Sequence, residues 1–211
     1  MTAVGALAGF SAQYAIWKEV VEAGKMPLHG GEDQNAGAFV VMKTNNGETY
    51  YFGNLLNSYI VPQSKDIAPL GPGHFTLWGF LASAVQATGG EPTSGDAINS
   101  IFQHAASTVG TPNFGVPQLP EMHRPGLPPR ELLNKLWPGA KSILGSTDVP
   151  GEGNESLPIG LWPTVVALTA QKLIEQAKDA IDPTLAMRIA LEAAVPMSKV
   201  DPQTVPQDFN E

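Results

Sequence analysis

The chain has no cysteine among its 211 residues. Disulfide bonds, thiolate zinc sites, iron–sulfur clusters and cysteine nucleophiles are therefore all excluded. A chain of this length buries enough surface to fold without such cross-links, and one domain is the better expectation for it. We expect a single compact domain over residues 1–195, followed by an extended, proline-containing C-terminal tail over residues 196–211.

Charged side chains are also scarce, and positive ones are the scarcest. The chain contains twelve Lys and Arg and twenty Asp and Glu, which gives a net charge of -8. Charged residues make up 15% of the chain, below the typical value of about 25%. No three basic residues are consecutive, so the sequence predicts neither a nucleic-acid partner nor a membrane partner. The low charge leaves apolar or neutral surface, which favours a homo-oligomer, for example a dimer that uses the C-terminal tail.

The first 17 residues carry no charged side chain. A signal peptide requires basic residues before its apolar part, and none precedes this stretch. The stretch is also too short to span a membrane. We therefore expect a buried helix in a cytoplasmic protein. Large apolar residues such as Phe10 and Tyr14 recur at helical spacing, while Gly5, Gly9 and several alanines occupy the other faces. Such small residues allow another helix to approach closely.

Two β-type segments, Phe39–Met42 and Thr49–Phe52, flank Asn46-Gly47. This dipeptide predicts a hairpin with a type I′ turn, because its two central residues tolerate positive φ. An isolated hairpin is marginal in water, so its strands must pack on helices or pair with further strands. Neighbouring strand residues point to opposite faces, so one of the hairpin tyrosines can line a pocket. Tyr51 is therefore a candidate ligand-binding residue, with core packing as the alternative.

Most of the remaining chain predicts helices. Their apolar periodicity, caps and breakers indicate helices near 75–88, 98–109, 130–144, 163–181 and 183–195. The expected fold is α+β and predominantly α-helical, a multi-helix domain with one β-hairpin over about residues 38–52 that packs on the helices.

The candidate catalytic residues lie mainly in the irregular stretch 110–129, which holds six prolines and three glycines. Loops this long in compact domains are usually functional or disordered. Glu121, His123 and Arg124 combine proton-transfer groups with an anion-binding group, and Arg130 follows as a candidate ligand-binding residue. His104 is a further catalytic candidate, because Ser100 lies one helical turn before it. The alternative is that these side chains bind backbone carbonyls or another subunit.

A second polar group offers candidate metal ligands. His29, Glu32 and Asp33 lie in a glycine-containing loop, and imidazole and carboxylate groups are both metal donors. The alternative is an exposed polar turn. We favour this alternative and predict no metal site. Motifs for phosphate loops, dinucleotides, zinc proteases and serine hydrolases are absent, and we predict no cofactor.

Two hypotheses of function follow from these observations. The first is a non-enzymatic protein that self-associates and binds a protein or a small molecule through low-charge surface. The second is a small enzyme, or a small-molecule-binding protein, whose polar site contains Glu121, His123 and Arg124. We favour the first hypothesis, because no catalytic motif of known geometry is present.

Overall fold

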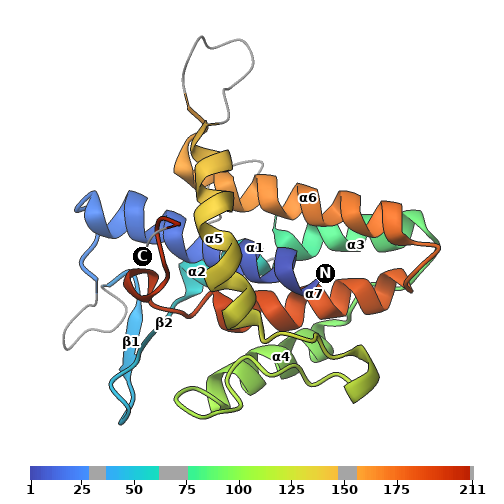
Figure 1. Ribbon diagram of the computed structural model, residues 1–211, viewed down its shortest axis with the longest axis horizontal. Helices are drawn as coiled ribbons and strands as arrows, with labels where there is room; N and C mark the ends of the chain where they lie inside the picture. The colour runs from blue at the N-terminus through green and yellow to red at the C-terminus, as the bar shows by residue number, and fades with distance from the viewer. Residues whose placement is uncertain (29–36, 62–75, 147–155, 210–211) are drawn as a thin grey trace.

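The computed structural model describes residues 1–28, 37–61, 76–146 and 156–209. These residues form a mostly helical α+β fold, as the sequence predicted. Figure 1 labels its helices and strands, which are α1 (Thr2–Ile16), β1 (Val40–Lys43), β2 (Thr49–Phe52), α2 (Asn54–Ile60), α3 (Leu77–Ala87), α4 (Gly95–Ser107), α5 (Pro129–Ser146), α6 (Trp162–Ala177) and α7 (Pro183–Met197).

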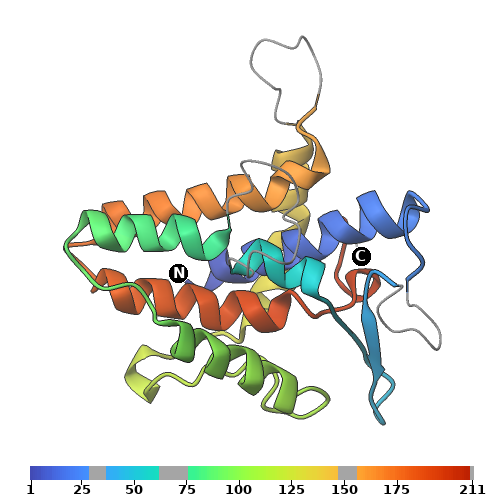
Figure 2. The ribbon, with the colours of Figure 1, turned by 180° about the vertical axis from the view of Figure 1, so that it is seen from behind.

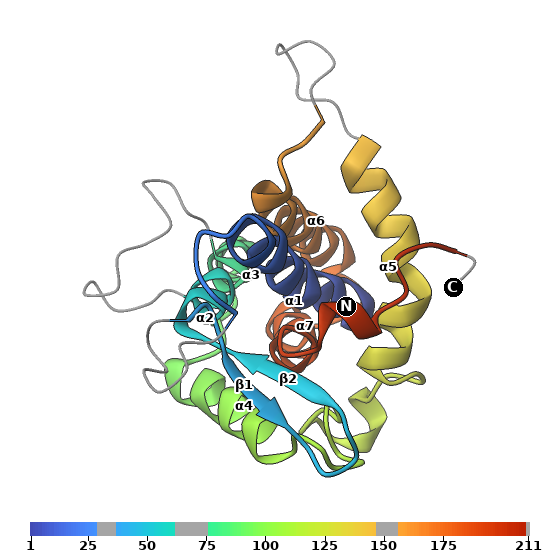
Figure 3. The ribbon, with the colours of Figure 1, turned by 90° about the vertical axis from the view of Figure 1, so that its left-hand side faces the viewer.

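Helix α1 lies in the middle of the helical assembly. It contacts α5, α6 and α7, and Figure 3 shows these helices around it. Every residue of α1 except Ala3 and Leu7 is buried, and a π-helical segment, Trp17–Glu22, continues it. The predicted buried N-terminal helix is therefore confirmed. Its lack of charged side chains follows from its central position, because almost no part of it reaches water.

Helices α1 and α7 approach each other closely at two glycines of α1. A Cβ atom on Gly5 would collide with the carbonyl oxygen of Ala190 and lie 2.8 Å from its Cα atom. A Cβ atom on Gly9, one turn later, would meet Ala194 in the same way. Small residues therefore face each other from both helices, and the two backbones are in direct contact. This contact confirms the close helix approach that the small residues predicted.

Aromatic side chains attach α5 and α6 to α1. The ring of Phe10 meets Trp137 of α5 edge-on, with centroids 4.6 Å apart, and Tyr14 stacks on Trp162 of α6 at 5.7 Å. Figure 1 shows α5 running steeply across α6 and α7. Trp137 has no exposed surface. The helix α5 does not end at the next residue, Pro138, but continues to Ser146.

Side-chain caps mark the starts of two outer helices. Ser94 caps α4 through the Ala97 amide, and Asp182 caps α7 through the Leu185 amide, with Pro183 at the first turn. Helix α3 packs on α6 and α7, as Figure 2 shows from behind, and α4 packs on α7.

The hairpin forms at the predicted position, but its turn differs from the predicted type I′. Strands β1 and β2 are antiparallel, with Lys43 paired to Thr49. The Gly47 amide donates to the Thr44 carbonyl at 3.0 Å, and Gly47 has φ of 86°. None of the described non-glycine residues has positive φ, so Asn46 does not adopt the conformation that type I′ requires. A type I′ turn joins the strands through two loop residues, whereas this hairpin uses three. The longer loop allows a type I turn that is followed by Gly47 in the left-handed conformation.

The hairpin packs on the helices and also pairs with the chain after α7. The Tyr51 ring lies 5.4 Å from Trp17 and 5.3 Å from Phe39, in a second core cluster. The Tyr51 amide donates to the Lys199 carbonyl at 2.8 Å, and Tyr50 pairs with Val200. These contacts supply the support that an isolated hairpin lacks.

The C-terminal segment is held by its own chain. Helix α7 continues through Pro196 to Met197, and Lys199, Val200 and Val205 are all buried. Near the end, the Gln207 carbonyl accepts a hydrogen bond from Lys141 of α5 at 3.2 Å. The order of residues 198–207 therefore requires no second subunit.

The close approach of α1 and α7 predicts a strong effect of one added methyl group. We expect Gly9→Ala to lower the free energy of unfolding by roughly 2–3 kcal/mol, because the α7 backbone must move to accept it. Gly95→Ala is the matched control, since a Cβ atom at Gly95 in α4 meets nothing within 4 Å. Urea denaturation would compare the two variants, and equal stabilities would contradict the predicted clash.

Candidate functional site

A pocket of about 210 Å³ lies between the hairpin, the loop after α4, the start of α5 and the chain after α7. We call it the Arg130 pocket, and Figure 3 shows these elements converging below α1. The hairpin and the start of α5 are neighbours here although they are far apart in the sequence. The pocket is lined by Glu48, Thr49, Tyr50, Thr111, Phe114, Arg130, Val200, Asp201 and Thr204.

Arg130 is fixed at the wall of this pocket by one edge of its guanidinium group. Its Nη2 donates to the Thr204 hydroxyl at 2.7 Å and to the Thr204 carbonyl at 3.2 Å. Burial lowers the pKa of Arg130, and the nearby Tyr50, Glu48 and Asp201 oppose this shift. Nε and Nη1 make no hydrogen bond within the described residues, so donors remain available to an anion.

Tyr50 and Glu48 form a second wall. The Tyr50 hydroxyl donates to Glu48 Oε2 at 2.9 Å, and the Asn46 side-chain amide donates to the same oxygen at 2.8 Å. Burial, assisted by Glu48, raises the pKa of Tyr50 to about 12, so its phenol stays neutral at pH 7. The Tyr50 ring meets Phe114 edge-on at 4.7 Å. The carboxylate of Glu48, an exposed residue, is therefore held at the edge of the pocket by two hydrogen bonds.

Asp201 supplies a second carboxylate. It is buried, and its Oδ1 accepts a hydrogen bond from the Gln203 amide at 2.9 Å. Within the described part of the chain, Arg130 forms no ion pair with either Asp201 or Glu48. The pocket thus holds one positive and two negative groups, and no ion pair among the described residues joins the positive group to either negative one.

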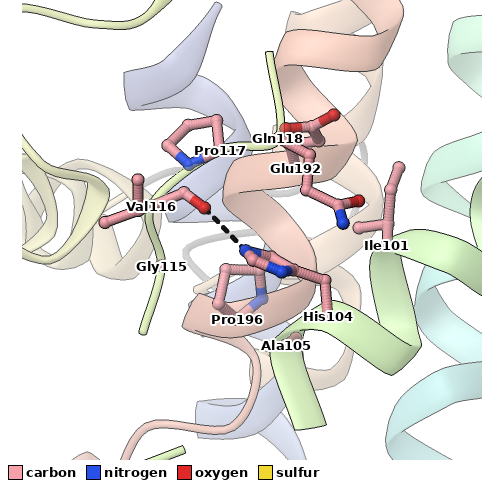
Figure 4. Close-up of a pocket in the computed structure, with 9 residues that line it drawn as sticks. All are labelled: Ile101, His104, Ala105, Gly115, Val116, Pro117, Gln118, Glu192 and Pro196. Carbon is pink, nitrogen blue, oxygen red and sulfur yellow. Dashed lines mark hydrogen bonds between the residues drawn. The ribbon is translucent and has the colours of Figure 1, made fainter. Parts of the chain in front are cut away.

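A much smaller cavity, of about 10 Å³, lies between α4, α7 and the stretch 110–129. Figure 4 shows His104 of α4 turned toward this stretch, where its Nε2–H donates to the Val116 carbonyl at 2.9 Å. Glu192 of α7 also lines the cavity; its Oε1 accepts from Arg188, and its Oε2 has no hydrogen-bond partner within the described residues. This volume is about that of a single water molecule, which excludes an organic ligand.

Lys199 is an unusual buried cation, with an exposed fraction of 2%. Its Nζ donates to Asn57 Oδ1 at 2.7 Å and lies 5.7 Å and 5.4 Å from the ring centres of Phe52 and Phe102. Burial lowers the pKa of Lys199 to about 7. The amine is therefore far easier to deprotonate than that of an ordinary lysine, because burial removes the water that would stabilise its charge, and no ion pair with a carboxylate is found for it among the described residues.

The catalytic candidates of the 110–129 stretch lie on its surface. A single 3-10 turn, Glu121–His123, carries two of them, and Glu121 and Arg124 are exposed. Arg124 Nε donates to the Leu119 carbonyl at 2.9 Å, so this side chain supports its own loop. These candidates line neither the Arg130 pocket nor the cavity at His104.

The other sequence candidates are separated from one another. Arg130 lines the larger pocket, whereas Tyr51 belongs to the core and its neighbour Tyr50 lines the pocket instead. The metal candidates His29, Glu32 and Asp33 lie outside the described residues. Within the described part, no three metal-ligating side chains come together.

Of the nine residues that line the Arg130 pocket, the sequence marked only Arg130 as a site residue. Among the eight that it missed are the two carboxylates, Glu48 and Asp201, and their neighbours Tyr50 and Thr204. Glu48 lies in the hairpin loop, and Asp201 and Thr204 lie in the chain after α7, where polar residues are common. The only signal was the strand alternation at Tyr50 and Tyr51, which predicted that they face opposite sides. That signal does not tell which tyrosine faces the core.

Comparisons with known protein families, curated proteins and solved structures found no match to this chain. In the part of the chain that the structure describes, no helix combines the length and apolar character needed to cross a membrane. The function must therefore be inferred from the pockets and surfaces of the chain itself.

The buried amine of Lys199 predicts a pH-dependent stability. Between pH 7 and about pH 10, the unfolded chain binds a proton that the folded chain does not, because burial lowers the folded pKa to about 7. The free energy of unfolding should therefore rise with pH in this window, by about 1.4 kcal/mol per pH unit.

Lys199→Met should remove this slope and stabilise the protein at pH 7. Lys178→Met, at an exposed position, serves as the control and should keep the slope. Denaturant titrations at several pH values would measure it. A slope that is unchanged in Lys199→Met would show that the amine is not the titrating group.

Proposed function

We propose that this protein is a non-enzymatic binding protein whose Arg130 pocket holds a small molecule through an anionic group. The observation that carries the proposal is the incomplete hydrogen bonding of the Arg130 guanidinium group within the described residues. Thr204 anchors Nη2, while Nε and Nη1 make no hydrogen bond within the described residues and lie at the wall of a cavity. A planar guanidinium with two donors available is suited to a carboxylate or a phosphate.

The size of the pocket supports a metabolite rather than a larger ligand. About 210 Å³ is below the roughly 300–1,000 Å³ of pockets for drug-sized molecules. Phe114 and Val200 provide apolar contact, and Tyr50, Thr111 and Thr204 contribute hydroxyl groups. This combination of apolar walls and a few polar groups is typical of small-molecule sites.

Binding is better supported than catalysis. The described residues that line the pocket include no histidine or lysine, and the raised pKa of Tyr50 makes its phenol a poor proton donor to a substrate at pH 7. Catalysis by Glu121, His123 and Arg124 is the alternative hypothesis. It has less support, because Glu121 and Arg124 are exposed and Arg124 holds its own loop.

Arg130→Gln tests the proposed binding function. We expect small carboxylates or inorganic phosphate to raise the melting temperature of the wild type, because a ligand that prefers the native state stabilises it. Arg130→Gln should weaken this binding at least tenfold in calorimetry, the order expected for a charge-assisted pair. Arg124→Gln should bind as the wild type does, because Arg124 lies away from the pocket.

Two outcomes would contradict the proposal. One is that no carboxylate and no phosphate binds the wild type at millimolar concentration. The other is that Arg130→Gln binds the same ligand with unchanged affinity. Denaturation of the ligand-free variant separates lost binding from lost folding, because Arg130 also contacts Thr204.

Self-association is a second candidate function, and the outer side of α5 favours it. Ile143 is 68% exposed, and Leu136, two turns earlier, is also exposed. Phe209, which is 74% exposed, lies over Gly139 between them, where its Cζ atom is 3.3 Å from the position of a Cβ atom. An apolar face that contains a residue of the C-terminal segment is consistent with the proposed dimer.

Sedimentation of two matched variants tests this association. We expect the wild type to sediment as a dimer at micromolar concentration and Ile143→Lys to sediment as a monomer, because burying an unpaired charge opposes association. Leu173→Lys alters a residue of α6 that is 41% exposed and should stay dimeric. A monomeric wild type would contradict the proposed dimer.

A further inference from the structure

The charges around the Arg130 pocket do not match a simple anion. One guanidinium group lies among two carboxylates, those of Glu48 and Asp201. Both carboxylates act electrostatically on Arg130, so they are close to it, yet within the described residues neither forms an ion pair with it. A ligand with only a negative group would gain the attraction of Arg130 but would be repelled by both carboxylates.

The carboxylates are also held in place. Glu48 Oε2 accepts hydrogen bonds from Tyr50 and from Asn46, and Asp201 Oδ1 accepts one from the Gln203 amide. Asp201 is buried, where charge interactions are stronger than in water. Negative groups fixed in this way are arranged to hold a cation, since a preorganised site loses little freedom on binding.

From this arrangement we infer that the ligand of the Arg130 pocket is a small zwitterion, an amino acid or a related molecule with one carboxylate and one ammonium group. The ligand's carboxylate pairs with the Nε and Nη1 side of Arg130. Its ammonium group lies against Glu48 and Asp201. Phe114 and Val200 contact the carbon chain between or beside the two groups. This inference rests on the proposed function and specifies its ligand class.

The zwitterion accounts for the separation of charges in the pocket. When Arg130 and the two carboxylates are bridged by a ligand, each charged group acquires a partner of opposite sign. Neither a carboxylate alone nor an amine alone achieves this, because each leaves one side of the pocket uncompensated. The ligand class is therefore set by complementarity of charge, whereas the apolar contacts limit its size.

Calorimetry with three kinds of probe tests the inference. The zwitterions are glycine, β-alanine and L-alanine; the carboxylate is propionate; and the amine is propylamine. We expect at least one zwitterion to bind the wild type tenfold or more tightly than propionate and propylamine. Propionate that binds as tightly as every zwitterion would overturn the inference.

Glu48→Gln provides the variant test. The amide oxygen of the new glutamine can still accept the hydrogen bond from Tyr50, while the substitution removes one negative charge. Zwitterion affinity should fall at least fivefold, while propionate affinity stays equal or rises. Glu91→Gln, at an exposed position, is the control for net charge and should change neither affinity. Equal weakening of both probes in Glu48→Gln would contradict a contact between Glu48 and the ammonium group.

The outcomes also separate this inference from the proposed function. If propionate or inorganic phosphate binds through Arg130 and no zwitterion binds more tightly, the pocket is an anion site and only the inference fails. If no zwitterion, carboxylate or phosphate binds the wild type, the proposed function fails as well.

Discussion

The contact between α1 and α7 is the interaction on which the remainder of the structure depends. Gly5 and Gly9 place the backbone of α1 directly against Ala190 and Ala194, and any side chain at these glycines would separate the helices. Interiors are packed closely enough that such a separation must be transmitted to neighbouring elements. Because α7 is fixed in this way, the residues that follow it reach the hairpin at one defined position.

That position connects the fold to the pocket. Lys199 and Val200 pair with the hairpin next to Tyr50 and Tyr51, and Thr204 then reaches the guanidinium of Arg130. The hairpin is therefore both a support for the C-terminal segment and a wall of the pocket. The burial of Lys199 is a consequence of the same path, and its lowered pKa is an energetic cost of placing a lysine there.

Local pattern predicted several elements correctly. The close helix approach at the small residues of α1, the hairpin strands on either side of Asn46-Gly47, and a helix that begins at residue 183 are all found in the structure. Each depends on a few neighbouring residues, so local chemistry was sufficient. The turn type was wrong because one extra residue in the loop changes which backbone conformation is easiest.

The sequence by itself determined the helical α+β class, the hairpin and the absence of cysteine chemistry, since composition and periodicity depend only on residue order. It also marked Arg130 as a candidate ligand-binding residue. Only the tertiary structure decided which polar groups lie beside Arg130. Glu48 comes from a turn and Thr204 from the chain after α7, and they meet because helix packing brings distant segments together. Side-chain proximity of this kind has no local signal, and the charge balance of the pocket follows from it.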